Sequence, residues 1–235
     1  MKILSWNCNC KFREKFHLLD QYNADIMIIQ ECEDPKQSLH KEYKSWAKNY
    51  IWVGDNKHKG LGVFASKNIN LKKLPIPSRN YKLFLPILIN NKHTLIGVWT
   101  KASTTTKKGY INQLYNFLVE NKKILDFSKI IIAGDWNSNA QWDNKRPIGN
   151  HSDVVRLLKK ENVYSAYHYL KKIDHGSEVD TTFYLYRNKI RSFHIDYIFL
   201  NKNWLTTPYS FSVFNSDQWL KYSDHVPIVF AGHNS

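Results

Sequence analysis

The stretch "IIIAGDWNSN" at residues 130–139 joins an apolar strand to a polar loop. Its first residues, three isoleucines and an alanine, predict a buried strand. Gly134 then lets the backbone turn, and Asp135 and Asn137 follow with Trp136 between them. A turn requires polar residues, but it does not require a carboxylate and an amide on either side of a tryptophan. The end of this strand therefore suggests chemistry as well as structure.

Short apolar stretches rich in Ile, Val, Phe and Tyr recur along the chain and predict further strands. They lie at residues 2–7, 24–31, 50–54, 60–66, 81–89, 94–100, 181–186, 193–200, 209–214 and 225–231. Other segments have apolar residues at helical spacing, and we expect helices at 11–23, 110–125 and 152–162, the last with Ser152 as its N-cap. Since no repeat or linker divides the chain, we expect one domain over residues 1–235.

Many strands interleaved with a few helices predict two packed sheets covered by helices, a layered α/β sandwich. The loops between the later strands are too short for parallel crossovers, so we expect mixed or antiparallel pairing. This fold class hosts many activities, and the function has to be argued from particular residues.

The chain carries a formal net charge of +14 and a pI near 9.5, which favours polyanionic partners. Nucleic acid, anionic lipid headgroups and phosphorylated small molecules all fit this charge, and so does general solubility without any such partner. No apolar run reaches the ~18 residues of a membrane span, and no secretory signal is recognisable. We therefore expect a cytoplasmic protein that makes no membrane contact, with Cys8, Cys10 and Cys32 as reduced thiols.

Polar residues recur at the ends of the predicted strands. They are Asn7 and Asn9, Gln30 and Glu31, Asp135 and Asn137, Asp196 with His194, and Asp224 with His225. Most have an ordinary explanation, since Asp and Asn are common in turns. Asp196 is the exception, because a carboxylate inside the apolar stretch "HIDYIF" costs several kcal/mol unless it is paired. His225 is the preferred partner, and His194 is the alternative.

These residue types suit the metal-assisted hydrolysis of a phosphate ester. Mg²⁺ prefers oxygen ligands, usually one or two carboxylates with water and substrate phosphate, and Glu31 suits that role. A histidine oriented by a carboxylate can donate to phosphate or move a proton, and Asp135 can orient or deprotonate the attacking water. The amides of Asn7 and Asn137 can hold phosphate oxygens without adding negative charge.

The same segments resemble the endonuclease/exonuclease/phosphatase superfamily, which includes exonuclease III, apurinic endonucleases and deoxyribonuclease I. The matching motifs occur in order over essentially the whole chain: "WNCN" at 6–9, "IIQE" at 28–31, "GDWNSN" at 134–139, "TTFYLYRN" at 181–188, "HIDYIF" at 194–199 and "SDHVPI" at 223–228. The resemblance implies a deoxyribonuclease I-like fold, a four-layer α-β-β-α sandwich of two mixed β-sheets with the site at one end. It also implies Mg²⁺ as cofactor, with Mn²⁺ as a substitute.

The resemblance also implies roles for individual residues. The implied catalytic set is Asp135, Asn137, Asp196, His225 and Asn7. Asp135 and Asn137 would position the nucleophilic water and the phosphate, and Asn7 would lie near the metal and the phosphate. Asp196 would hold His225.

The implied metal site shows departures from the family pattern. Glu31 would be the principal ligand with Asp224 close to the metal, but Asn9 stands where exonuclease III-type nucleases carry an aspartate, which weakens a second metal position. Trp99 stands where the family tends to place a Tyr or His that contacts phosphate. Tryptophan can stack or donate one N–H, and Lys101 can supply the phosphate contact instead.

Charge, basic loops and aromatic residues together favour nucleic acid as the substrate. Basic and polar runs lie at 55–60, 101–110 and 142–151, with aromatic side chains among them that can stack on bases. The expected substrate-binding residues are Trp99, Lys101, Asn139, Trp142 and His194. The leading hypothesis is a monomeric Mg²⁺-dependent nuclease that hydrolyses DNA phosphodiester bonds. A phosphatase or phosphodiesterase of the same superfamily, acting on a smaller phosphorylated substrate or on RNA, is the alternative, and a domain that only binds nucleic acid comes third.

Overall fold

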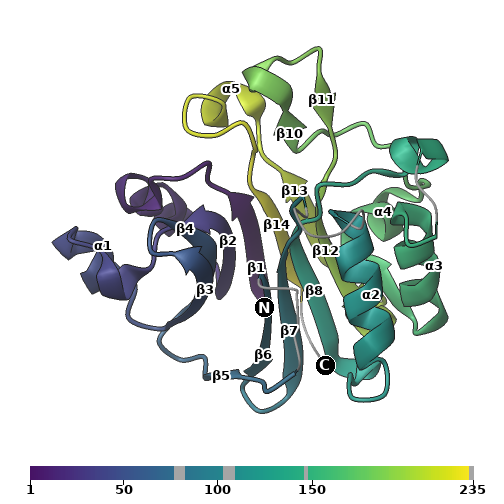
Figure 1. The fold of residues 1–235 in the computed structure, drawn as a ribbon, viewed down its shortest axis with the longest axis horizontal. Helices are drawn as coiled ribbons and strands as arrows, with labels where there is room; N and C mark the ends of the chain where they lie inside the picture. Colours follow the sequence, from purple (N-terminus) through teal and green to yellow (C-terminus); the bar gives the residue numbers. More distant parts are fainter. Residues whose placement is uncertain (77–82, 103–108, 146–147, 233–235) are drawn as a thin grey trace.

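Two β-sheets pack face to face at the centre of the molecule (Figure 1). The computed structural model describes residues 1–76, 83–102, 109–145 and 148–232. In the first sheet the strand order is β13 (Tyr209–Val213), β14 (Ile228–Gly232), β1 (Lys2–Asn7), β2 (Ile26–Cys32), β4 (Lys59–Ala65) and β3 (Tyr50–Asn56). In the second it is β5 (Leu71–Lys73), β6 (Phe84–Ile89), β7 (His93–Trp99), β8 (Ile130–Asp135), β12 (Asp196–Asn201) and β9 (Val163–Ser165). The β1–β2 and β7–β8 pairs are parallel while the others described are antiparallel, which confirms the predicted mixed pairing.

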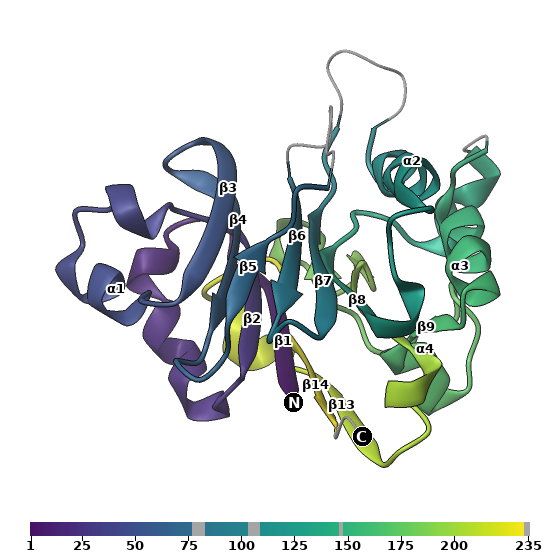
Figure 2. The same cartoon turned by 90° about the horizontal axis from the view of Figure 1, so that it is seen from below.

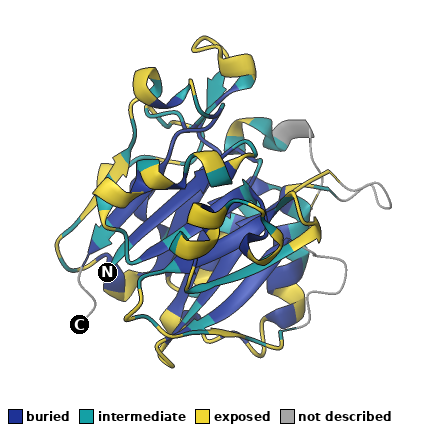
Figure 3. Cartoon of the chain, turned by 90° about the vertical axis from the view of Figure 1, so that its left-hand side faces the viewer, coloured by how far each residue is buried: buried dark blue, intermediate teal, exposed yellow. Residues whose placement is uncertain are grey.

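Successive side chains along a strand point to opposite faces of its sheet. They fill one apolar core between the two sheets and one core between each sheet and its helices, which gives the four-layer sandwich. Ile3 and Ile131 lie in the core between the sheets, whereas Leu4 and Ile132, one residue later, lie in the outer cores. Helices cover both outer faces (Figure 2): η1 (Phe12–Glu14), η2 (Phe16–Tyr22) and α1 (Lys41–Trp46) on the first sheet, and α2 (Ile111–Asn121) and α3 (His151–Lys160) on the second. In Figure 3 the central strands are mostly buried, and the exposed residues lie on helices, loops and edge strands. The predicted fold class is confirmed.

Two predicted helices differ in detail from the structure. Residues 11–23 form two 3₁₀ helices, because the chain breaks at Lys15, whose ammonium donates to the carbonyls of Cys8 (2.6 Å) and Tyr222 (2.7 Å). The predicted N-cap Ser152 is wrong, since Asn150 caps α3 by accepting from Asp153 N–H, and the Ser152 hydroxyl donates to Asp143 instead. The remaining short elements are η3 (Pro35–Gln37), η4 (Phe127–Lys129), η5 (Ala140–Lys145), α4 (Ala166–Lys171), β10 (Phe183–Tyr184), η6 (Leu185–Arg187), β11 (Ser192–Phe193), η7 (Lys202–Trp204) and α5 (Ser216–Trp219).

Parts of the predicted features lie outside the described residues. These parts are residues 81–82 of a predicted strand, residues 103–108 of the basic run 101–110, and residues 146–147 of the basic run 142–151. Among the described residues, no helix has the length and apolar character needed to cross a membrane.

One end of the sandwich collects the polar strand ends. β1 finishes at Asn7 beside Gln30 of β2, while Asp135 at the end of β8 pairs with Asp196 at the start of β12. Gly134 makes this end of β8 possible, because its φ is +146° and a Cβ there would lie 1.8 Å from the carbonyl oxygen of Val98. The predicted need for glycine at position 134 is thus explained, because any side chain there would collide with the neighbouring strand.

Candidate active site

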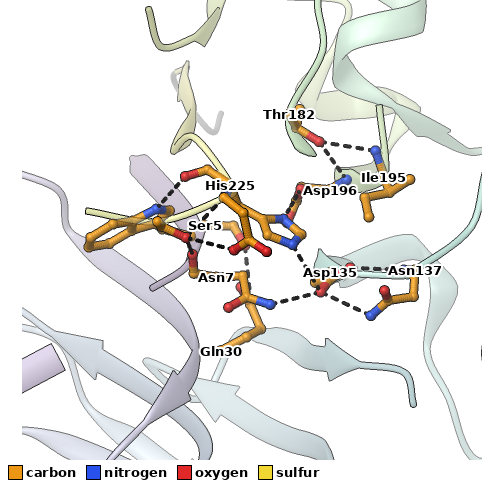
Figure 4. Close-up of polar contacts among 12 residues, drawn as sticks. Ser5, Asn7, Gln30, Asp135, Asn137, Thr182, Ile195, Asp196 and His225 are labelled. Atoms are coloured by element: carbon orange, nitrogen blue, oxygen red, sulfur yellow. Dashed lines mark hydrogen bonds and ion pairs between the residues drawn. The ribbon is translucent and has the colours of Figure 1, made fainter. Parts of the chain in front are cut away.

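His225 and Asp196 form a buried pair that joins the two sheets (Figure 4). His225 precedes β14 of the first sheet and Asp196 opens β12 of the second, and their Nδ1 and Oδ2 atoms lie 2.8 Å apart. The two residues are only 4% and 0% exposed. The structure therefore selects His225, and not the alternative His194, as the partner that a buried Asp196 needs.

Asp135 is the second centre of the site. Its Oδ2 accepts hydrogen bonds from the amides of Asn7 and Asn137, each at 3.0 Å, and its Oδ1 accepts from the backbone N–H of Asn137 at 2.9 Å. The bond from Asn7 again crosses between the sheets. On the other side, His225 Nε2 lies 3.9 Å from Asp135 Oδ2, so the imidazole stands between two carboxylates (Figure 4).

The electrostatics of this trio follow from burial and from these neighbours. Burial raises the pKa of Asp135 to about 7, although the nearby His225 opposes that rise. Burial alone would lower the pKa of His225, but Asp196 and Asp135 raise it to about 10. His225 is therefore a cation at neutral pH. Although Asp135, Asp196 and His225 lie close enough together to hold a metal, a protonated imidazole has no free lone pair for one, and we interpret the trio as a hydrogen-bonded acid–base set.

Glu31 sits at an irregularity that projects it from the sheet. The β2–β4 register shifts between Gln30 and Cys32, and Glu31 between them adopts φ +64°. A left-handed backbone at a non-glycine residue costs on the order of 1–3 kcal/mol and is common at functional sites. The Glu31 side chain remains 15% exposed, and its Oε2 lies 2.8 Å from Lys59 Nζ and 3.5 Å from Cys10 Sγ.

The sequence signature of the endonuclease/exonuclease/phosphatase family matches residues 4–225, a range that contains every residue of this site. The chain belongs to the endonuclease/exonuclease/phosphatase family. Enzymes of this family are phosphoesterases and nucleases that generally use divalent metal ions. No curated protein sequence is significantly similar to the chain.

Solved structures of this superfamily share the fold over the full length of the chain. An AP endonuclease from Archaeoglobus fulgidus has a TM-score of 0.71 at 19% identity, and a variant of the 3′ phosphatase NExo from Neisseria, bound to a product DNA hairpin, has a TM-score of 0.70 at 16% identity. In both cases 99% of this chain and 99% of that chain are covered. A truncated TDP2 from Caenorhabditis elegans has a TM-score of 0.67 at 15% identity, with 98% and 96% covered. At these identities the likeness concerns the fold.

The predicted metal-site residues lie at the end of the sandwich that also holds Asp135 and His225. Asn7 presents its Oδ1 to the backbone N–H of Asn9 at 3.1 Å, with its amide nitrogen turned to Asp135. Ser223 Oγ donates to the carbonyl of Asn7 at 2.7 Å, which ties the loop carrying Asp224 to the end of β1. Together with Glu31, these residues offer amide and carboxylate oxygens, which are the ligands that a hard divalent cation prefers. The donor chemistry therefore fits Mg²⁺.

The predicted substrate-binding residues separate into two groups. Lys101 and Lys59 place their Nζ atoms 4.6 Å and 5.5 Å from the Trp99 ring centroid, so two cations flank one aromatic side chain near Glu31. Trp99 itself is 3% exposed. Trp142 is half-buried, with its ring edge-on to Phe193 at 4.9 Å.

Asn139 and His194 lie inside the molecule instead. Asn139 is 1% exposed and donates to Glu178 Oε2 (3.1 Å) and to the His194 carbonyl (3.0 Å), while His194 Nδ1 lies 2.8 Å from the Asp180 carbonyl. Because their polar groups bind the protein, we leave both out of the proposed substrate surface. Trp136 is also fully buried and stacks on Phe199 at 4.6 Å.

Three supporting residues escape prediction from the sequence. Thr182 Oγ1 accepts from the backbone N–H groups of Ile195 and Asp196, and Ser223 Oγ accepts from His225 N–H at 3.0 Å. Both lie within motifs quoted above, "TTFYLYRN" and "SDHVPI". Lys59 belongs to the basic run 55–60, but no spacing indicates that it pairs with Glu31.

Proposed function

We propose that the protein is a Mg²⁺-dependent nuclease that hydrolyses phosphodiester bonds of DNA. The observation that carries the proposal is the buried arrangement Asp196–His225–Asp135, with His225 held as a cation between two carboxylates. Such a group can stabilise negative charge that develops on a phosphate in the transition state. The cross-sheet bond from Asn7 to Asp135 fixes the second carboxylate beside it.

Asp135 is the residue proposed to orient the attacking water. Its Oδ2 already accepts two amide hydrogen bonds, which hold the carboxylate in one orientation. Asn137 lies in the left-handed region (φ +47°), where asparagine is tolerated better than most residues. Its amide also donates to the Thr100 carbonyl, which ties the turn after β8 to the residue that follows β7.

Glu31 is proposed to hold the metal, with Asp224 and Asn7 near it and Asn9 at the position of a weakened second site. When bound, Mg²⁺ would neutralise charge on a phosphate oxygen as a Lewis acid. The Lys59 ammonium beside Glu31 is consistent with this role, because it is a cation that the carboxylate already attracts. Mn²⁺, which prefers similar oxygen ligands, is expected to substitute.

DNA is proposed as the substrate from the charge and from the cations beside the site. The net charge of +14 attracts a polyanion, and the exposed Lys101 beside Trp99 would supply a local phosphate contact. Two of the neighbours named above are an AP endonuclease and a 3′ phosphatase, and the phosphatase was solved with a product DNA hairpin. Action as a cytoplasmic monomer stays a prediction.

A second candidate is removal of a terminal phosphate, because one structural neighbour is a 3′ phosphatase bound to product DNA. The test uses labelled duplex, abasic duplex and single-stranded DNA, RNA, and DNA with a 3′ phosphate, each with Mg²⁺ or EDTA. Strand cleavage of DNA that requires Mg²⁺ is expected. Phosphate release without any strand cleavage would establish the second candidate, and binding without either reaction would leave only a nucleic-acid-binding domain.

A further inference from the structure

A cluster of histidines lies behind the active site, on the side of β12 away from His225. It contains His151 at the start of α3, His168 in α4, His175 and Glu178 in the loop after α4, and His194 just before β12. None of these side chains has a role in the proposed phosphodiester chemistry.

The geometry at the centre of the cluster suits a metal ion. His168, His175 and Glu178 each offer a ligand atom, and these atoms all lie within 4.8 Å of one another. His168 Nε2 is 2.9 Å from Glu178 Oε1, and the His168 and His175 rings stack with centroids 3.6 Å apart. The ligand atoms of a metal site lie close to one another in this way because they all contact the same ion.

Outer partners hold these donors in place. His168 Nδ1 lies 2.8 Å from Ser165 Oγ, His175 Nδ1 lies 3.0 Å from His151 Nε2, and Glu178 Oε1 accepts from Gly176 N–H at 3.0 Å. Metal-ligating histidines typically bond through the second ring nitrogen in this way, which fixes the ring orientation.

Two histidines of the cluster have buried nitrogen atoms without a hydrogen-bond partner among the described residues. His194 is 2% exposed, and its Nδ1–H donates to the Asp180 carbonyl, which leaves Nε2 with a lone pair that no described group satisfies. His151 Nδ1 also has no hydrogen-bond partner among the described residues. The His194 ring lies 5.8 Å from that of His168. Buried polar atoms without partners are rare and require an explanation.

An opening to solvent reaches the cluster. A cavity of about 180 Å³ is lined by His168 and His175 together with Asp174, Tyr169 and Phe199. Two of the three proposed ligands therefore border this cavity, whose lining also carries the Asp174 carboxylate and the Lys159 ammonium.

We propose that His168, His175 and Glu178 bind a divalent transition-metal ion of the Zn²⁺ class, with His194 or water at the fourth position. Two imidazole nitrogens with one carboxylate favour Zn²⁺ over Mg²⁺, which prefers oxygen ligands alone. Asn139 Nδ2 donates both to Glu178 and to the His194 carbonyl, so the ion would hold the loop after Asp135 from behind. The bound ion would therefore stabilise the fold, at a site separate from the proposed catalytic metal at Glu31. This inference does not depend on the proposed function.

The experiment titrates the EDTA-treated protein with Zn²⁺ by calorimetry, in excess Mg²⁺ so that the catalytic carboxylates are occupied. The wild type and the exposed control His17→Gln are expected to bind one Zn²⁺ tightly, while His175→Gln and Glu178→Gln lose at least about tenfold in affinity. Zn²⁺ should also raise the Tm of the wild type and not of these two variants. If His175→Gln does not fold, the isosteric Glu178→Gln decides. Equal zinc binding by the variants and the wild type, or no zinc binding by the wild type, would overturn the proposal.

Discussion

Asp196 Oδ2 lies 2.8 Å from His225 Nδ1; Asp196 opens β12 of the second sheet, and His225 lies just before β14 of the first. A second bond, from Asn7 to Asp135, joins the same two sheets in the same place. The site therefore exists only when the sheets are packed together, and the apolar core between them holds its geometry. Pre-organisation of this kind keeps charged groups oriented without any rearrangement during the reaction.

Asp196→Asn should reduce kcat by about 10²–10⁴-fold, the usual contribution of an oriented acid–base group. The amide keeps the size of the side chain, but it no longer raises the pKa of His225. Steady-state cleavage of a labelled DNA duplex measures the effect, with the exposed carboxylate variant Asp217→Asn as the matched control. Cleavage close to the wild-type rate in Asp196→Asn would mean that the pair is structural only.

Glu31→Gln should abolish Mg²⁺-dependent cleavage while the fold persists, because the side chain is partly exposed and its carboxylate contacts Lys59 and Cys10. The same variant should lose the increase in Tm that Mg²⁺ gives to the wild type. Cleavage assays and thermal unfolding with and without Mg²⁺ test the two effects together. Normal turnover in Glu31→Gln would remove Glu31 from the metal site.

The motifs allow much of the fold to be predicted from the sequence, together with the polar residues that meet at the candidate site. Strand ends such as "GDWNSN" bring their polar residues to one end of the sheets, because the strands that carry them have a fixed direction. Asn139 is among the predicted substrate-binding residues, but the turn after β8 carries its side chain back to Glu178.

Other features could not be predicted because they depend on contacts between distant segments. Lys59 reaches Glu31 through the β2–β4 pairing, and the bulge at Glu31 has no local signature. His168, His175 and His194 gather only when α4 packs beside β12. No regular spacing in the sequence links them.

Lys59→Met should lower the Mg²⁺ concentration for half-maximal activity by about two- to fivefold. The Lys59 ammonium lies 2.8 Å from Glu31 Oε2 and competes with the metal for that carboxylate, and a partly exposed ion pair contributes up to ~1 kcal/mol. A Mg²⁺ titration of the cleavage rate measures the shift, with the exposed Lys67→Met as control. A higher Mg²⁺ requirement in Lys59→Met would show that Lys59 supports the site rather than competing in it.

Lys101→Ala should weaken DNA binding uniformly across sequences and reduce the slope of log K against log salt by about one. Its ammonium stacks over Trp99 at 4.6 Å while the side chain itself is exposed, a position suited to a phosphate contact. Fluorescence anisotropy at several salt concentrations, in EDTA so that DNA is not cut, gives the slope. An unchanged slope would place Lys101 away from the DNA backbone, and Lys67→Ala serves as the exposed control.

The pH dependence of kcat/KM should show a plateau between two limbs. Burial raises the pKa of Asp135 to about 7, so the carboxylate that orients water forms as the pH rises through that value, and the rate should rise with it. Asp196 and Asp135 overcome the effect of burial and raise the pKa of His225 to about 10, so the cation is lost, and the rate should fall, as the pH rises through that value. Asp196→Asn removes one of the two carboxylates that support the cation, and the descending limb should therefore move to lower pH. A descending limb at the same pH in Asp196→Asn and wild type would show that the limb reports some group other than His225.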